Sequence, residues 1–147
     1  MTAARTEGLT KNFVAEATIN PYRIVKFGTS DNGVTQAAAA TDALLGIAKV
    51  PQGQYSRAIQ TGSTPPALGV VTIAANFQVD VVLSGIAEVQ YGGTVARGDL
   101  LTADANGKAV KATPAAGVNN RIVGMATISG VADDIGCILI CPGSIQG

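Results

Sequence analysis

The sequence contains no histidine among its 147 residues. Histidine is the usual general base of serine hydrolases, the commonest zinc ligand and the only side chain whose ordinary pKa lies near neutrality. A serine–histidine–aspartate triad and a zinc hydrolase are therefore excluded. Because imidazole is also missing from any ligand set, we expect the protein to bind no metal and no cofactor.

Aromatic residues and net charge are scarce as well. The chain has no tryptophan, three tyrosines and three phenylalanines, and ten Lys and Arg residues balance ten Asp and Glu residues. Proteins that bind nucleic acid need a basic surface for the phosphate backbone, and single-strand binders add aromatic rings on which bases stack. The sequence therefore predicts no nucleic-acid partner.

Long apolar runs are missing. No run approaches the roughly 18 residues of a membrane-spanning helix. The polar start Met1–Glu7 lacks the apolar centre of a signal peptide. We expect a soluble protein that is not exported and has no membrane partner.

Only two cysteines are present, Cys137 and Cys141. Four positions apart on a strand, they share a face with Cα atoms about 13 Å apart, which is beyond the roughly 7 Å limit for a disulfide. We expect buried free thiols in a protein made in a reducing compartment.

The residues in excess are small or β-branched. The chain holds 24 alanines, 15 valines, 12 isoleucines, 8 leucines and 18 glycines. This inventory suits thin, closely packed sheets, because β-branched side chains pack well on a pleated surface. The length is that of one domain, which can bury a core without disulfides or metal.

The clearest period in the sequence runs from Gln78 to Tyr91. Every odd position is apolar or glycine, which is typical of a strand with one buried face. A straight strand of this length would span about 45 Å, so Gly85 is predicted to mark a bend between two parts of the fold. The odd positions are Val79, Val81, Leu83, Gly85, Ala87, Val89 and Tyr91.

Turn signals such as Asp31-Asn32-Gly33, Tyr91-Gly92-Gly93 and Asn106-Gly107 divide the remaining chain into short pieces. Their spacing predicts an all-β fold: a small β-barrel or sandwich of short antiparallel strands, with one long bent strand (about 78–91) and an extended N-terminal arm. Residues Thr35–Leu45 contain four consecutive alanines and have helical propensity as an alternative, although a strand is favoured. The expected strands are Leu9–Ile19, Tyr22–Phe27, Val34–Ala39, Leu44–Val50, Leu68–Ile73, Gln78–Tyr91, Leu100–Ala103, Ala109–Ala112, Ile122–Ile128 and Ile135–Cys141.

The predicted organisation has two parts. Residues 1–19 form an N-terminal arm and first strand, and residues 20–147 form a single β-barrel domain with a long polar loop at 51–66. Glycine lies between branched residues at Gly46, Gly69 and Gly124. We expect these glycines to let a sheet turn a corner or a neighbouring strand pack closely.

No catalytic constellation is visible. Asp133 and Asp134 are adjacent, so on a strand they point to opposite faces and cannot share a proton. The tripeptide Arg97-Gly98-Asp99 occurs in integrin ligands, but here it precedes Leu100 as an ordinary turn into a strand. We expect no enzymatic activity.

The second half of the chain resembles a family of small β-barrel proteins, the head-decoration or capsid cement proteins of tailed bacteriophages. The resemblance covers about residues 34–141, most clearly from 67 onward, whereas the N-terminal segment and the 51–66 loop depart from the pattern. It rests on Val79–Val82, Gly85–Val89, Gly98–Leu101, Asp104–Val110, Ile122–Ala126 and Gly136–Ile140.

This resemblance implies a non-enzymatic structural virion protein. It would bind the outer surface of a phage capsid and stabilise, or cement, neighbouring capsomers. The implied partners are the major capsid protein and further copies of the chain, as a homo-oligomer in which a trimer is favoured and a dimer is possible. The expected location is the capsid exterior of the virion, after synthesis in the cytoplasm of the host bacterium.

Contact residues are predicted in the two peripheral segments. Arg5, Lys11 and Phe13 in the arm, and Tyr55 and Arg57 in the long loop, are candidates for capsid or subunit contact. An arm strand that pairs with a partner's exposed sheet edge would tie neighbouring subunits together. The alternative function is a β-barrel ligand- or glycan-binding module, displayed on a virion or assembly, that uses the Tyr55 loop.

Overall fold

The computed structural model describes residues 8–49 and 72–147, which form ten strands and no helix. Within those ranges there is accordingly no helix long and apolar enough to cross a membrane. The strands are β1 (Thr10–Ala15), β2 (Ile24–Phe27), β3 (Gly33–Gln36), β4 (Leu44–Ala48), β5 (Gln78–Val82), β6 (Gly85–Gln90), β7 (Leu100–Ala103), β8 (Ala109–Lys111), β9 (Asn119–Ala126) and β10 (Ile135–Gln146).

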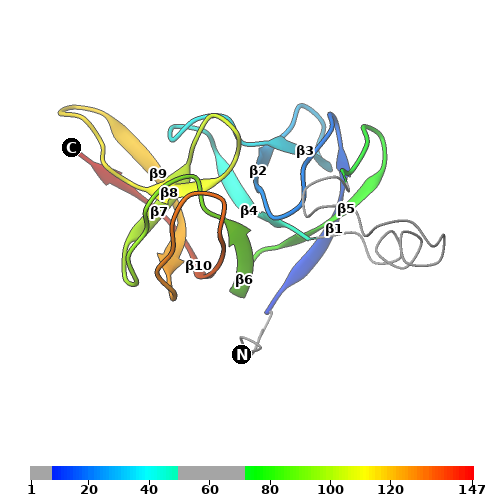
Figure 1. The fold of residues 1–147 in the computed structure, drawn as a ribbon. Helices are drawn as coiled ribbons and strands as arrows, with labels where there is room; N and C mark the ends of the chain where they lie inside the picture. The colour runs from blue at the N-terminus through cyan, green and yellow to red at the C-terminus, as the bar shows by residue number, and fades with distance from the viewer. Residues whose placement is uncertain (1–7, 50–71) are drawn as a thin grey trace, which may run out of the picture.

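The strands form two sheets that lie side by side (Figure 1). The first is a closed barrel in the order β1-β3-β2-β4-β5, and the second has the order β6-β10-β9-β7-β8. The predicted all-β barrel or sandwich is confirmed. One pair, β1 with β3, is parallel, although all pairs were expected to be antiparallel. A closed ring of five strands has an odd number of pairs, so strand directions cannot alternate throughout and one pair must be parallel.

The long alternating segment serves both sheets, as predicted. β5 pairs with β1 and β4 in the barrel, whereas β6 pairs with β10 in the second sheet. Gly85 has a φ of 84°, a backbone conformation that side chains with a Cβ rarely adopt. The segment therefore bends at Gly85, where it leaves one sheet and enters the other, and it forms two strands instead of one.

Two clusters of buried apolar residues make up the core. One cluster fills the barrel and includes Phe13, Ile19 and Val34. The other lies between the sheets, because it joins barrel residues such as Ile24 and Ile47 to residues of the second sheet. An isolated parallel bridge between Tyr91 and Ala109 connects the end of β6 to β8, so the second sheet also curls toward closure.

Several predicted boundaries are corrected. The first strand is Thr10–Ala15, and only Ile19 beyond it forms a bridge, to Ile73. The alanine run after Gln36 forms bends and turns, neither the favoured strand nor a helix. β10 runs on to Gln146 because its distal half pairs with β9.

The predicted arm and the predicted loop differ in how much of each is described. From Thr10 onward the arm is a barrel strand of its own chain, since β1 pairs with β3 and β5. The 51–66 loop lies outside the described residues, as do Gly69 and all of the predicted strand Leu68–Ile73 except its last two residues.

Glycines at two of the predicted positions allow close packing. A Cβ on Gly46 would lie 2.2 Å from the Val82 carbonyl oxygen, and one on Gly124 would lie 2.3 Å from the Leu139 carbonyl oxygen. Both neighbours are backbone atoms of an adjacent strand, which confirms the predicted role of these glycines.

Candidate functional site

The structure describes two of the five predicted contact residues, and both lie on β1. Lys11 is exposed, with its Nζ atom 4.7 Å from the centroid of the Phe13 ring. Phe13 is only 4% exposed and belongs to the barrel core. It was predicted to contact a partner, and this is wrong because its ring is already buried by its own chain. Arg5, Tyr55 and Arg57 lie outside the described residues.

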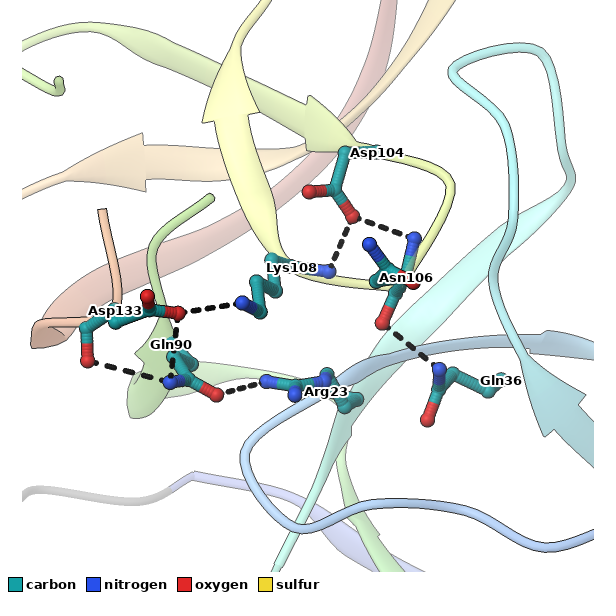
Figure 2. Close-up of polar contacts among 7 residues, drawn as sticks. All are labelled: Arg23, Gln36, Gln90, Asp104, Asn106, Lys108 and Asp133. Atoms are coloured by element: carbon teal, nitrogen blue, oxygen red, sulfur yellow. Dashed lines mark hydrogen bonds and ion pairs between the residues drawn. The ribbon is translucent and has the colours of Figure 1, made fainter. Parts of the chain in front are cut away.

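A cluster of polar side chains joins the two sheets (Figure 2). Arg23, which precedes β2, donates from Nη1 to the side-chain oxygen of Gln90 at the end of β6. Gln90 Nε2 in turn donates to Asp133 Oδ1 at 3.3 Å, and Lys108 Nζ pairs with the same carboxylate at 2.5 Å. The chain of contacts thus runs from the barrel to the turn before β10.

The hairpin between β7 and β8 docks on the barrel beside this cluster. Asp104 Oδ1 accepts hydrogen bonds from the backbone N–H groups of Asn106 and Lys108, at 2.8 and 2.9 Å. The Asn106 carbonyl accepts from Gln36 Nε2 at 2.8 Å, and the Gly107 carbonyl accepts from the Ile24 N–H at 2.8 Å. The predicted Asn-Gly turn is therefore also a contact between the sheets.

The electrostatics of this cluster suit a structural junction. Burial lowers the pKa of Arg23, and the negative charges of Asp104 and Asp133 partly offset this by raising it. The hydrogen bond and charge of Lys108 lower the pKa of Asp133. Two cations and two carboxylates lie together, so their charges balance. The buried Arg23 Nε has no hydrogen-bond partner among the described residues. We interpret the cluster as the polar link that fixes the two sheets.

The cysteines and the Arg97-Gly98-Asp99 turn carry no site of their own. Cys137 is buried, and this burial raises the pKa of its thiol. Cys141 is exposed, so the prediction that both thiols are buried is wrong for Cys141. The turn before β7 is confirmed, with Asp99 Oδ2 bound to the Ala96 N–H at 2.9 Å and Oδ1 paired with Lys111 at 3.0 Å. In the described part of the chain, no three His, Cys, Asp or Glu residues are grouped to hold a metal ion.

Apolar side chains form a row across the outer face of the second sheet. The strand register places Leu139 opposite both Ile86 and Met125, and Met125 opposite Leu100. Leu139 and Leu100 are each 39% exposed, and the other two are half-buried. Directly opposed residues on one face of a sheet are in contact range, so these four form one continuous apolar strip.

A groove of about 370 Å³ opens where the end of β2 and the start of β4 approach the first half of β9 and the distal half of β10. Phe27, Leu44 and Ile122 supply apolar walls, and Arg121 supplies the charged lining residue. Phe27 is 56% exposed. None of these residues was predicted as a site, because each looks in the sequence like an ordinary strand residue. The remaining lining residues are Ala43, Pro142, Gly143 and Ser144.

Comparisons with known proteins find a likeness in structure and not in sequence. No protein-family model matches the chain, and no curated protein matches it. Among solved structures, the N base of the head fiber protein gp8.5 of bacteriophage phi29 is similar, with a TM-score of 0.58 and 16% sequence identity. The match covers 95% of this chain and 98% of that one, so the likeness extends over the whole fold.

Proposed function

We propose that this protein is a structural component of a bacteriophage head. The observation that carries this proposal is the fold shared with the phi29 head fiber base over nearly the full length of both chains. The independent resemblance of residues 34–141 to capsid decoration proteins points to the same class. A head-associated role is therefore supported by the arrangement of the strands and by the sequence pattern.

Within the head, we propose that the protein binds the outer surface of the capsid and stabilises neighbouring capsomers. Its proposed partners are the major capsid protein and further copies of itself, with a trimer favoured over a dimer. The apolar strip of Ile86, Leu100, Met125 and Leu139 supports a role in protein contacts, because exposed apolar patches mark such surfaces. Its free thiols fit synthesis in a reducing cytoplasm before assembly.

The decisive experiment compares phage heads with and without this protein. Electron cryo-microscopy is expected to show density of this fold on the outer capsid surface, and heads lacking it are expected to release DNA at a lower temperature. If the density is present but heads with and without the protein release DNA at the same temperature, the head location stands and the cement function is wrong. Absence of the protein from purified heads would overturn the proposal.

The N-terminal arm is proposed as one of the attachment elements. Because β1 begins at Thr10 and is paired on both sides, a deletion of residues 2–7 leaves the barrel strand intact. This variant is expected to fold normally and to occupy capsids less. Undiminished occupancy would remove the arm from the proposal.

Ligand or glycan binding is the second candidate, and the groove beside Phe27 is the observation that favours it. Sugar-binding sites present aromatic rings, and among the described residues this groove presents one, from Phe27. A rise in melting temperature on addition of host cell-wall glycans, absent in Phe27→Ala, would favour this function over cementing.

A further inference from the structure

The distal half of β10 is a sheet edge without a partner strand among the described residues. β6 pairs with β10 only as far as Ile140, opposite Gly85, whereas β9 continues along β10 to Gln146. Beyond Ile140 the two strands therefore form a two-stranded ribbon that extends to the C-terminus (Figure 1). The β10 side of this ribbon is therefore an edge to which a further strand can be added.

The backbone groups that this edge offers follow from the register. Ser144 lies opposite Arg121, whose N–H bonds to the Ala40 carbonyl at 2.7 Å and so points away from β10. Arg121 and Ser144 are therefore a non-hydrogen-bonded pair of the antiparallel ladder. Both residues of such a pair direct their N–H and C=O groups away from the partner strand. The N–H and C=O of Ser144 therefore face the open edge, and no hydrogen bond to them is found from the described residues.

The side chains of this edge carry no charge to protect it against strand pairing. From Ile135 to Gly147 there is no Lys, Arg, Asp or Glu. Proteins commonly protect exposed edges with charged residues or proline. Pro142 occupies the bulge between Ile140 and Gly143, so it removes one donor at the start of the edge and leaves Ser144 available.

The groove lies at this same edge and has a defined chemistry. Gly143 and Ser144 of the open edge line it together with the Phe27 ring and Ile122. Arg121 is exposed, and no ion pair joins it to a carboxylate of the described residues. A groove with apolar walls and a guanidinium that no carboxylate of the described residues pairs complements an apolar side chain near a carboxylate.

We propose that the open edge of β10 and its groove bind an extended, acidic segment of a partner protein. The segment adds as a third strand on Ser144, places an apolar side chain against Phe27, and pairs a carboxylate with Arg121. Because alternate residues of a strand share a face, the apolar and acidic residues are two positions apart. The proposal rests on the proposed function in one respect: the partner is a subunit of the phage capsid.

A second copy of the chain is the less favourable occupant. The β10 edge has no side-chain carboxylate to offer to Arg121 of another copy, since residues 135–147 contain no Asp or Glu. Self-pairing of two such edges would leave both guanidinium groups without a side-chain counter-ion from the partner edge. Charge complementarity therefore favours a different protein.

A peptide experiment tests the site without capsids. The probe is a fluorescein-labelled, capped nonapeptide with a central valine–threonine–glutamate sequence, and the control peptide has lysine in place of glutamate. Anisotropy is expected to show binding of the glutamate peptide and at least about tenfold weaker binding by Arg121→Glu. Arg97→Glu makes the same charge change outside the groove and is expected to stay within about twofold of the wild type.

A pair of substitutions at Ser144 tests the strand addition. Ser144→Pro removes only an outward N–H and not a bond to β9, whereas Ser144→Ala keeps that N–H. With far-UV circular dichroism unchanged in both, the proline variant is expected to lose peptide binding and the alanine variant to keep it. Equal binding by the two would overturn the edge role.

The outcomes on capsids separate this inference from the proposed function. Wild-type protein that fails to bind capsids but binds the glutamate peptide overturns the capsid function and supports the site. Wild-type and Arg121→Glu proteins that occupy capsids equally overturn the site and leave the capsid function standing. If the wild type is an oligomer that does not bind the peptide, and light scattering shows that Arg121→Glu is a monomer, the edge pairs with a second copy. That result overturns the proposal.

Discussion

Among single residues, Glu16 stands out because one carboxylate holds a whole turn. It accepts hydrogen bonds from the backbone N–H of Thr29 at 2.8 Å and of Ser30 at 2.8 Å, and from both hydroxyl groups. These bonds, that of the Ser30 hydroxyl first, lower the pKa of Glu16 to about 2. The turn that Glu16 holds joins β2 to β3, so this residue after β1 fixes the parallel pair of the barrel.

Glu16→Gln is expected to change how stability depends on pH. The pKa of Glu16 falls from 4.5 to about 2 on folding, so its ionised form stabilises the fold above pH 4.5, and this contribution is lost as pH falls from 4.5 toward 2. The variant should be less stable than the wild type at pH 7, and its free energy of unfolding should fall less steeply between pH 4.5 and pH 2. Urea midpoints measured from pH 7 to pH 2 check this. Ser30→Ala should show a smaller change of the same kind, and an unaltered slope in Glu16→Gln would contradict the assignment.

Tyr91 is a buried residue whose side chain makes one hydrogen bond within the described part of the chain. Its ring is fully buried, its hydroxyl donates to the Ile128 carbonyl at 2.7 Å, and burial raises its pKa to about 12. Tyr91→Phe leaves that carbonyl without its donor, so the free energy of unfolding should fall by about 1–2 kcal/mol. Urea denaturation measures the loss. The neutral phenol stabilises the fold below pH 10, and this contribution should disappear as pH rises toward 12, which tyrosinate absorbance follows.

At the scale of elements, the alternation from Gln78 to Tyr91 was the best guide to the fold. It correctly predicted the bend at Gly85 and the passage from one part of the fold to the other, because a period of two and one glycine are local properties of the chain. The segment was predicted as one long bent strand, however, and it forms two. The parallel pairing of β1 with β3 was not predictable, since it follows from closing five strands into a ring. Sequence periodicity reports which face of a strand is buried and not which strand lies beside it.

The candidate groove escaped sequence analysis for a related reason. Phe27, Arg121 and Ser144 are distant in the chain, and only the approach of β2 to the distal β9–β10 ribbon brings them together. One signal was available: residues 135–147 contain no charged side chain, which is unusual for a strand that ends at the surface. Phe13 was misplaced because a single aromatic ring in a polar segment does not reveal which way it points.

Gly124→Ala tests the close approach of β9 and β10. An added Cβ would lie 2.3 Å from the Leu139 carbonyl oxygen, a backbone atom that moves only with its strand. Overpacking of this kind should lower the free energy of unfolding by about 1–3 kcal/mol. Gly93→Ala is the matched control, because a Cβ there has no atom within 4 Å. Equal melting temperatures for the two variants would contradict the strand spacing.

For the whole molecule, the two sheets share one core and one polar link. Ile24 and Ile47 of the barrel belong to the same buried cluster as Leu101 and Ile138 of the second sheet. The Arg23 cluster and the Gln36–Asn106 contact add hydrogen bonds across the same boundary. The barrel has a buried cluster of its own, but every clustered buried residue of the second sheet belongs to the cluster shared with the barrel. The described strands should therefore behave as one cooperative unit.

Ile24→Ala tests this cooperativity. Ile24 is fully buried in the barrel strand β2 and packs in the cluster shared by the sheets, so the truncation should cost about 2–5 kcal/mol. Because the core is shared, hydrogen exchange in β9 and β10 should accelerate by the same factor as exchange in β2 and β5, although the substitution lies in the other sheet. Val34→Ala, in the cluster inside the barrel, is the matched comparison. It should also accelerate hydrogen exchange in β9 and β10 by the same factor as in β2 and β5. Protection of β9 and β10 that survives either substitution would mean that the second sheet folds independently, and the molecule would then consist of two units joined at Gly85.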